Sequence, residues 1–304
     1  MATEIERERF KTNPNRFIEE TIKQYVTTNP GNRFQAFNNE PIWDEPLVGF
    51  ADGDDPIFQD YKEIIGDFHL TPREALQQAT ESRRQVSNPG TASISVISWV
   101  LPSTRETRLS LRRETTVPSL RWNHTRWYGQ DVIFELSRHL VSRLQELGYR
   151  ALAPELSESF KTMNLVNGLS STWSQRHIAY AAGLGTFSLS DGFITPKGIA
   201  IRAGSVVCDA MLSPSPRTYR NHRDNCLFYR GGSCRRCIER CPAGAITEQG
   251  HDKNRCREFL FNEQRVILKE LGREKGYTGS YLGCGLCQTK VPCEGRIPPL
   301  PQTG

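Results

Sequence analysis

The sequence lacks the features that would place the protein in a membrane or on an export route. No apolar run approaches the roughly 18 residues that a transmembrane helix needs. The N-terminus is charged and of mixed sign. It has no apolar core of the kind found in a signal peptide, and no twin-arginine motif followed by such a core. We therefore expect a cytoplasmic protein, in a compartment that keeps thiols reduced.

A strong charge of one sign and internal repeats are also missing. The chain has 39 basic and 34 acidic residues, so its net charge is only +5. No sustained block of lysine and arginine with interleaved aromatic residues occurs. The acidic stretch 51–56 lacks the ligand spacing and the closing glutamate of an EF-hand loop. We therefore expect neither nucleic acid nor a membrane as a partner, and no calcium site.

Cysteine is scarce outside one segment and dense within it. Eight of the nine cysteines lie within residues 226–293, and the ninth, Cys208, is interpreted as an ordinary buried thiol. Pro242 directly follows one of the eight. The eight are Cys226, Cys234, Cys237, Cys241, Cys256, Cys284, Cys287 and Cys293.

Their spacing is typical of two cubane iron–sulfur clusters. Each cluster needs four thiolates, and in tandem-cluster ferredoxins the cysteine that precedes a proline binds the other cluster, not the one served by its own run. We therefore predict two [4Fe–4S] clusters. The first set of ligands is Cys226, Cys234, Cys237 and Cys293, and the second is Cys241, Cys256, Cys284 and Cys287.

Two other uses of these thiols stay open from the sequence. A zinc ion could take the two Cys-x-x-Cys pairs, at 234–237 and 284–287, as a four-thiolate site. That arrangement would leave the other four cysteines without a role. Disulfides would require export, and no signal sequence precedes them.

The rest of the chain alternates helical and extended patterns. A capping box at 71–74 predicts a helix as far as Ser82, and Asp131 is the expected N-cap of another helix. The pattern predicts helices in 1–35, 71–82, 132–148 and 172–182, a helix opened by Cys256, strands at 94–101, 149–154 and 199–207, and loop over 38–60. This order predicts a mixed α/β fold. We expect three parts: an N-terminal helical and loop segment packing on the core (1–85), an α/β domain (86–215) and a cluster domain (216–304).

Motifs at the end of the helix predicted over 172–182 resemble a known superfamily. Residues 182–185 read Ala-Gly-Leu-Gly, residues 191–196 read Asp-Gly-Phe-Ile-Thr-Pro, and the Cys-Pro run follows. This order is similar to that of the corrinoid-dependent reductases, which include the epoxyqueuosine reductases and the reductive dehalogenases. The resemblance implies a nitroreductase-like corrinoid-binding domain followed by a bacterial ferredoxin-like domain with two [4Fe–4S] clusters. It also implies cobalamin as a cofactor, lined by Gly183, Leu184, Gly185, Thr195, Pro196 and Gly198.

By the same resemblance the chain would be an oxidoreductase. A low-potential donor of the ferredoxin or flavodoxin type would pass electrons through the clusters to the corrinoid, which would reduce a small molecule or a modified nucleoside. The candidate proton donors are Tyr180, His177 and Glu155. Trp173, His177 and Tyr180 would share one helix face, for which core packing is the alternative explanation.

The sequence departs from the epoxyqueuosine branch at one point. That branch carries a catalytic aspartate shortly before the Gly-Leu-Gly loop, whereas residues 169–171 contain none. Two other functions therefore stay open. The chain could be an iron–sulfur electron-transfer protein that reduces a partner's cofactor and has no substrate of its own, or it could keep the clusters and bind no corrinoid.

Overall fold

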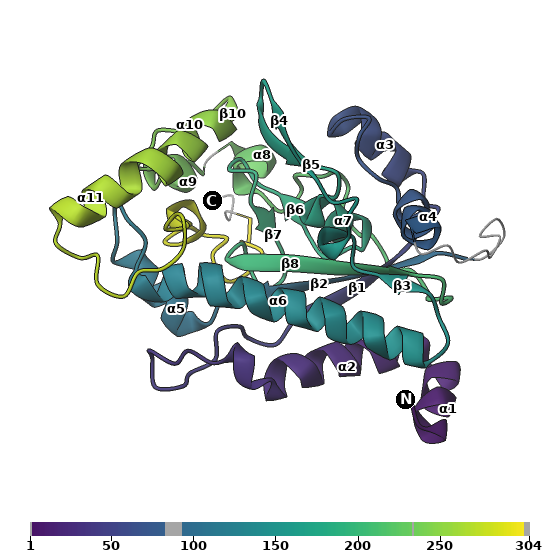
Figure 1. Ribbon diagram of the computed structural model, residues 1–304. Coiled ribbons are helices and arrows are strands. Elements are labelled where there is room, and N and C mark those ends of the chain that lie inside the picture. The colour runs from purple at the N-terminus through teal and green to yellow at the C-terminus, as the bar shows by residue number, and fades with distance from the viewer. Residues whose placement is uncertain (1, 83–92, 233, 301–304) are drawn as a thin grey trace.

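A four-stranded antiparallel sheet lies at the centre of the protein, with helices on both faces (Figure 1). The structure, a computed structural model, describes residues 2–82, 93–232 and 234–300. The strand order is β1 (Leu47–Asp52), β2 (Ser95–Pro102), β8 (Ile201–Cys208) and β3 (Ala151–Leu152). The predicted mixed α/β class is confirmed. The boundary expected between residues 85 and 86 lies outside the described residues, and the three-part division stays a prediction.

Side chains alternate along β2 between two hydrophobic cores, because successive residues of a strand point to opposite faces. Ile97, Trp99 and Leu101 belong to the core covered by helices α1 (Glu4–Thr12), α2 (Pro14–Thr28) and α6 (Leu120–Glu146). Val96 and Val100 belong to the core beneath α3 (Ile57–Ile64), α4 (Pro72–Ser82) and α7 (Gln175–Ala181). The sheet is therefore buried on both sides.

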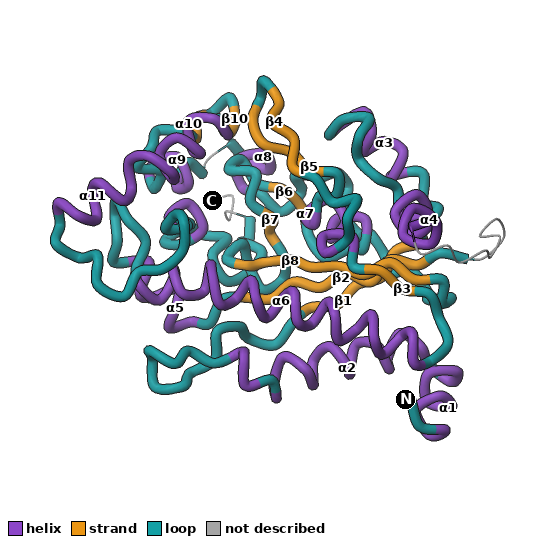
Figure 2. The backbone as a smooth tube through the Cα atoms, viewed as in Figure 1, coloured by secondary structure: helices purple, strands orange, loops and turns teal. Residues whose placement is uncertain are grey.

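The shorter elements lie around this frame, and the segments after β8 lie mostly at one end of it (Figure 2). They are η1 (Pro30–Asn32), α5 (Arg105–Arg112), η2 (Pro154–Leu156), β4 (Thr162–Leu165), β5 (Gly168–Ser171), β6 (Thr186–Phe187), β7 (Phe193–Ile194), α8 (Leu227–Gly231), α9 (Arg236–Glu239), β9 (Ile246–Thr247), β10 (Gly250–His251), α10 (Lys253–Glu258), the π-helical turn η3 (Phe259–Glu263), α11 (Gln264–Glu270) and η4 (Leu286–Gln288). No helix of the described ranges is both long enough and apolar enough to cross a bilayer.

The loop predicted over 38–60 is wrong, because β1 and the start of α3 lie within it. Pro46 and Gly53 flank a short apolar run, and these turn residues hid the strand. The run pairs along its whole length with β2. Gly49 within β1 is required by close packing, since a Cβ there would lie 2.3 Å from the carbonyl oxygen of Ala182.

Helix α6 begins at Leu120, so the N-cap predicted at Asp131 is wrong. Ser119 caps the helix, with its Oγ accepting a hydrogen bond of 3.2 Å from the Trp122 amide. The glycine at 129 favoured a helix that begins only after it. Instead Gly129 lies inside the helix, where its carbonyl accepts a hydrogen bond of 3.0 Å from the indole of Trp43.

Two further helix boundaries differ from those predicted. Helix α7 begins at Gln175, so Trp173 precedes it and does not share a helical face with His177 and Tyr180. The helix expected to open at Cys256 begins at Lys253, capped by the Asp252 carboxylate, and is interrupted by a π turn. By contrast, the capping box at 71–74 is confirmed by its two reciprocal hydrogen bonds, of 2.8 Å and 3.2 Å.

The packing of Gly129 gives the first testable prediction. Alanine at a helical glycine ordinarily stabilises by roughly 0.5–1 kcal/mol. At this position a Cβ would lie 2.6 Å from Cζ2 of Trp43, so Gly129→Ala should instead lower the free energy of unfolding by about 1–3 kcal/mol. Denaturant unfolding measures the change. Gly231→Ala is the control, since nothing lies within 4 Å of its Cβ position, and equal stability of the two variants would contradict the prediction.

Candidate iron–sulfur and cofactor site

The first turns of α6 hold the loop 276–285 against the sheet domain. Asn123 donates hydrogen bonds to the carbonyls of Thr278 and Leu282, at 3.1 and 3.0 Å, and the indole of Trp127 donates to the carbonyl of Tyr281 at 3.0 Å. The glycines of this loop take positive φ angles and lie against α6 side chains. A Cβ at position 285, for example, would meet the Trp122 ring at 2.2 Å. The packing of this loop therefore fixes the position of Cys284, which lies within it.

The structure brings the eight cysteines together as two sets of four. The first set, Cys226, Cys234, Cys237 and Cys293, borders a small cavity. The second set, Cys241, Cys256, Cys284 and Cys287, lines a much larger one of about 600 Å³. The electrostatic interactions among the thiols follow mainly the same division. These are the sets predicted from the spacing, and their assignment as ligands stays a prediction.

This grouping bears on the alternatives of zinc and disulfides. The two Cys-x-x-Cys pairs border different cavities, so they do not converge on one site. Within the part of the chain that the structure describes, no three histidine, cysteine, aspartate or glutamate side chains are placed to hold a single metal ion. All nine cysteines are free thiols. Four thiols around each of two cavities instead fit two cubanes, in which each thiolate binds a different iron.

The thiols need a cationic centre to ionise together. Burial, together with the neighbouring thiols, raises the pKa of Cys237 and of Cys284 to about 12. The pKa of Cys287 is raised well above its usual range by the same causes. Bound iron would supply the positive charge that stabilises the thiolates. Cys208 differs from the eight: it is buried in the sheet core, away from both cavities, and burial raises its pKa to about 12.

The cysteine that closes the first set is held by a buried carboxylate. Glu294 follows Cys293 and is only 4% exposed. Its carboxylate accepts a hydrogen bond of 2.7 Å from the Lys290 amide and pairs with the Arg112 guanidinium at 2.7 Å. Arg108 lies 3.5 Å away on the same helix, α5. The last cysteine is thereby anchored to the sheet domain.

The large cavity is shared between the second thiol set and the sheet domain. Helix α6 contributes Arg126 and Gln130 to its wall, and the start of β8 contributes Arg202. Tyr281 comes from the glycine-rich loop, and Glu155 comes from η2. The cavity therefore combines buried thiols with cations, a carboxylate and aromatic rings, and its volume lies in the range of small-molecule sites.

Comparisons with known proteins agree with this geometry. Residues 230–293 match the family model described as a 4Fe-4S double cluster binding domain. The C-terminal part of the chain is thus a double-cluster domain. The prediction of two clusters is confirmed at this level, and the disulfide and zinc alternatives are not needed to account for the thiols.

Much of the chain is also similar to named reductases. It is 28% identical over 253 residues to an epoxyqueuosine reductase of Bacillus cereus, across 81% of this chain and 60% of that protein. An epoxyqueuosine reductase of Synechocystis is 28% identical over 127 residues, across 41% of this chain and 39% of that protein. The resemblance found from the motifs is thus confirmed. The chain spans about 60% of the length of the first of these relatives.

A solved structure of a variant of the catabolic reductive dehalogenase NpRdhA shares the fold. Its TM-score is 0.52 at 13% identity, and the match covers 96% of this chain and 38% of that one. The likeness concerns the architecture of the chain alone. The predicted fold class is confirmed in this respect.

Of the three candidate proton donors, the structure brings only Glu155 to the large cavity. Burial raises its pKa above the ordinary value, although a hydrogen bond of 2.9 Å from Gln175 acts in the opposite direction. His177 packs between the rings of Tyr61 and Phe187, and burial lowers its pKa to about 3. Tyr180 packs on Phe187 and is absent from the cavity wall.

The six residues predicted to line a corrinoid are not among those that line the large cavity. Gly183 and Gly198 have positive φ angles, +73° and +90°, and any Cβ there would meet a backbone carbonyl. Thr195 hydroxyl donates to the Gly198 carbonyl at 2.9 Å and closes the turn around Pro196. Leu184 lies in the core beside Gly185. The structure gives these residues a local role, and their assignment to the cofactor stays a prediction.

Several residues of the cavity wall escaped the sequence analysis. Trp122 and Arg126 precede residue 132, where the sequence predicts the helix to begin, and Arg202 lies at the start of a strand. A helical reading of 120–130 would have placed Trp122, Arg126 and Gln130 on one face, four residues apart. That signal was available in the sequence.

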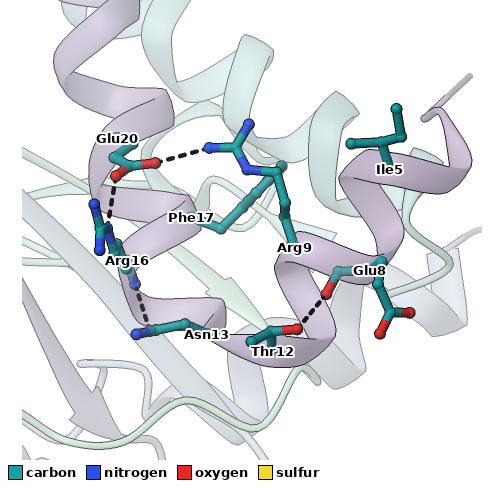
Figure 3. A pocket seen from close by; sticks show the side chains of 8 residues that line it. All are labelled: Ile5, Glu8, Arg9, Thr12, Asn13, Arg16, Phe17 and Glu20. Carbon is teal, nitrogen blue, oxygen red and sulfur yellow. Dashed lines mark hydrogen bonds and ion pairs between the residues drawn. The ribbon is translucent and has the colours of Figure 1, made fainter.

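A second hollow, of about 480 Å³, lies between α1 and α2 and has no thiol in its wall (Figure 3). Its two arginines already have a carboxylate partner. Arg9 and Arg16 pair with Glu20 at 2.8 Å and 2.7 Å, at the surface. This hollow is an exposed elbow between two helices, remote from the thiols in sequence and lined by paired charges.

The two thiol sets lead to the second testable prediction. Cys241→Ala should remove one cluster and lower the iron content from about eight to about four atoms per chain, because a cubane needs its four thiolates. Anaerobic reconstitution followed by iron and sulfide analysis measures this. Cys208→Ala is the matched control and should keep all the iron. Loss of iron from the Cys208 variant, or full retention in the Cys241 variant, would contradict the assignment.

Proposed function

We propose that this chain is a cobalamin-dependent iron–sulfur reductase. A low-potential protein of the ferredoxin or flavodoxin type supplies electrons, the two clusters transfer them, and an organic substrate is reduced in the large cavity. The observation that carries the proposal is that one cavity is lined both by the second set of four thiols and by the polar wall of the sheet domain. A redox group in this cavity would sit directly beside a cluster.

The wall of the cavity is compatible with a corrinoid, whose ring is edged by amide groups. Gln130 and Gln175 offer side-chain amides, Ser171 and Ser190 offer hydroxyls, and Trp122 offers an aromatic ring. These residues would hold the cofactor through hydrogen bonds at its edge and through ring contacts. When bound, cobalamin supplies the metal centre at which electrons reach the substrate.

Glu155 is the proton donor that the geometry supports best. A general acid must reach the reacting group and must keep its proton near the working pH. Glu155 lies in the cavity wall, and its burial favours the protonated form. His177 lacks this property, because burial lowers its pKa to about 3 and leaves it neutral without an extra proton. In this proposal Glu155 takes the place of the aspartate that residues 169–171 lack.

The names of the similar proteins suggest two classes of substrate. Epoxyqueuosine is the compound in the name of the Bacillus cereus protein, and a modified nucleoside is the first substrate class of this proposal. A small organic molecule is the other, as for a dehalogenase. The chain would be an oxidoreductase in either case.

Anaerobic purification and cofactor analysis test the proposed function. We expect about eight irons per chain, and we expect the protein to bind added cobalamin in a stoichiometric complex, seen by absorption and by cobalt content. Protein with a full complement of iron that binds no cobalamin would contradict the proposal. That result would favour an electron-transfer protein that serves a partner's cofactor.

Replacement of Glu155 separates the candidate proton donors. Glu155→Gln should lower the rate of substrate reduction by about 100-fold or more, because the amide cannot donate the proton. The wild-type rate should fall as the pH rises through the raised pKa of Glu155, and the variant should lack this limb of the profile. Tyr180→Phe is the control and should change the rate little. An unchanged rate in Glu155→Gln would contradict the assignment.

Glu155→Gln should be at least as stable as the wild-type protein. The folded protein holds the proton of Glu155 more tightly than the unfolded chain does, so ionisation of this carboxyl group lowers the free energy of unfolding as the pH rises. Glutamine removes this charge and can still accept the hydrogen bond from Gln175. A loss of activity with equal or higher stability would therefore identify a functional role.

A further inference from the structure

Two arginines in the wall of the large cavity lack a carboxylate partner. Arg126 donates a hydrogen bond of 2.8 Å to the hydroxyl of Tyr281, and Arg202 donates one of 3.1 Å to the side chain of Gln130. Neither guanidinium forms a salt bridge with any residue that the structure describes. Both are half-buried and lie close enough to interact electrostatically.

This arrangement leaves two neighbouring cations with neutral hydrogen-bond partners only. Burial and the neighbouring Arg126 lower the pKa of Arg202 to about 10, which reflects the difficulty of holding two cations there. Glu155 is the only carboxylate among the described residues of the cavity wall, and its own burial favours the neutral form. Arg176 adds a third guanidinium, which donates to the carbonyl of Asp191. Charges removed from water are normally paired with an opposite charge, and an anion in the cavity would supply that partner.

A different arginine lies beside the thiols of the second set. Arg240 is the guanidinium that interacts with the thiols of Cys284 and Cys287. The charged and polar groups that most affect the pKa of Arg202 are Arg126, Tyr281, Glu155 and Arg176. Both Arg126 and Arg202 line the large cavity together with Glu155.

We propose that Arg126 and Arg202 form a subsite for an oxyanion, a carboxylate or a phosphate, carried by a molecule that binds in the large cavity. A guanidinium offers a planar fork of N–H donors that matches the two oxygens of such a group. Tyr281 and Gln130 orient the two forks. The identity of the bearer rests on the proposed function: it is either the substrate or the phosphate of the cobalamin.

The subsite can be tested directly with small anions. The probe is inorganic phosphate or benzoate, titrated by calorimetry into cluster-loaded, corrinoid-free protein. We expect the wild type to bind the anion, and we expect Arg126→Gln and Arg202→Gln each to weaken binding by about tenfold or more, since each removes a charge-assisted hydrogen-bond donor. Arg202→Lys should recover part of the affinity, because it restores the charge but not the fork.

Arg16→Gln is the matched control. Arg16 lies at the surface and pairs with Glu20, so its loss should leave anion binding in the cavity unchanged (Figure 3). Iron analysis checks that each variant keeps its clusters. If a glutamine variant loses iron, the lysine variant at the same position takes its place in the comparison. No binding of either anion to the wild type, or equal affinity in the wild type and both glutamine variants, would overturn the inference.

Two corrinoids distinguish the sources of the oxyanion. Cobinamide lacks the phosphate of cobalamin. If Arg202→Gln weakens binding of cobalamin but not of cobinamide, the subsite holds the phosphate of the cofactor. If neither corrinoid is affected while anion binding is lost, the subsite serves the substrate. If the protein binds phosphate or benzoate but no corrinoid, the proposed function fails and the subsite stands.

Discussion

The contact between the first turns of α6 and the glycine-rich loop 276–285 is the constraint on which the site depends. The helix presents two tryptophan rings and an asparagine, and the loop can approach them only where it lacks side chains. Glycines at 279, 283 and 285 meet that condition, each with a positive φ angle. This packing sets the position of Cys284 relative to the sheet.

One consequence is that the two domains share a cavity. The sheet domain supplies cations and a carboxylate, and the double-cluster domain supplies four thiols. The first thiol set lies around a separate, smaller cavity and is anchored through Glu294. In the proposed function, electrons would pass from the first set to the second and then to the large cavity. In the same proposal Arg126 and Arg202, beside Glu155, would select the molecules that bind there.

The sequence predicted the iron–sulfur part well and the cavity poorly. Cysteine spacing is a local property, and the sets of four that it predicts are the sets that surround the two cavities. The cavity wall depends on tertiary contacts instead. Gly129 looked like a helix break because its packing against Trp43 is not visible in the sequence. The residues predicted to line a corrinoid include Gly183 and Gly198, which take positive φ angles in turns. That backbone conformation explains glycine at these positions as well as cofactor binding would.

Electron paramagnetic resonance of the reduced protein tests the central claim most directly. If each set of four thiols holds a cubane, fully reduced protein should show about two unpaired spins per chain, with signals broadened by the interaction of two neighbouring clusters. The Cys241→Ala variant should show one cluster, without that broadening. A wild-type protein with a single spin per chain, or a colourless protein that contains zinc in place of iron, would contradict the account.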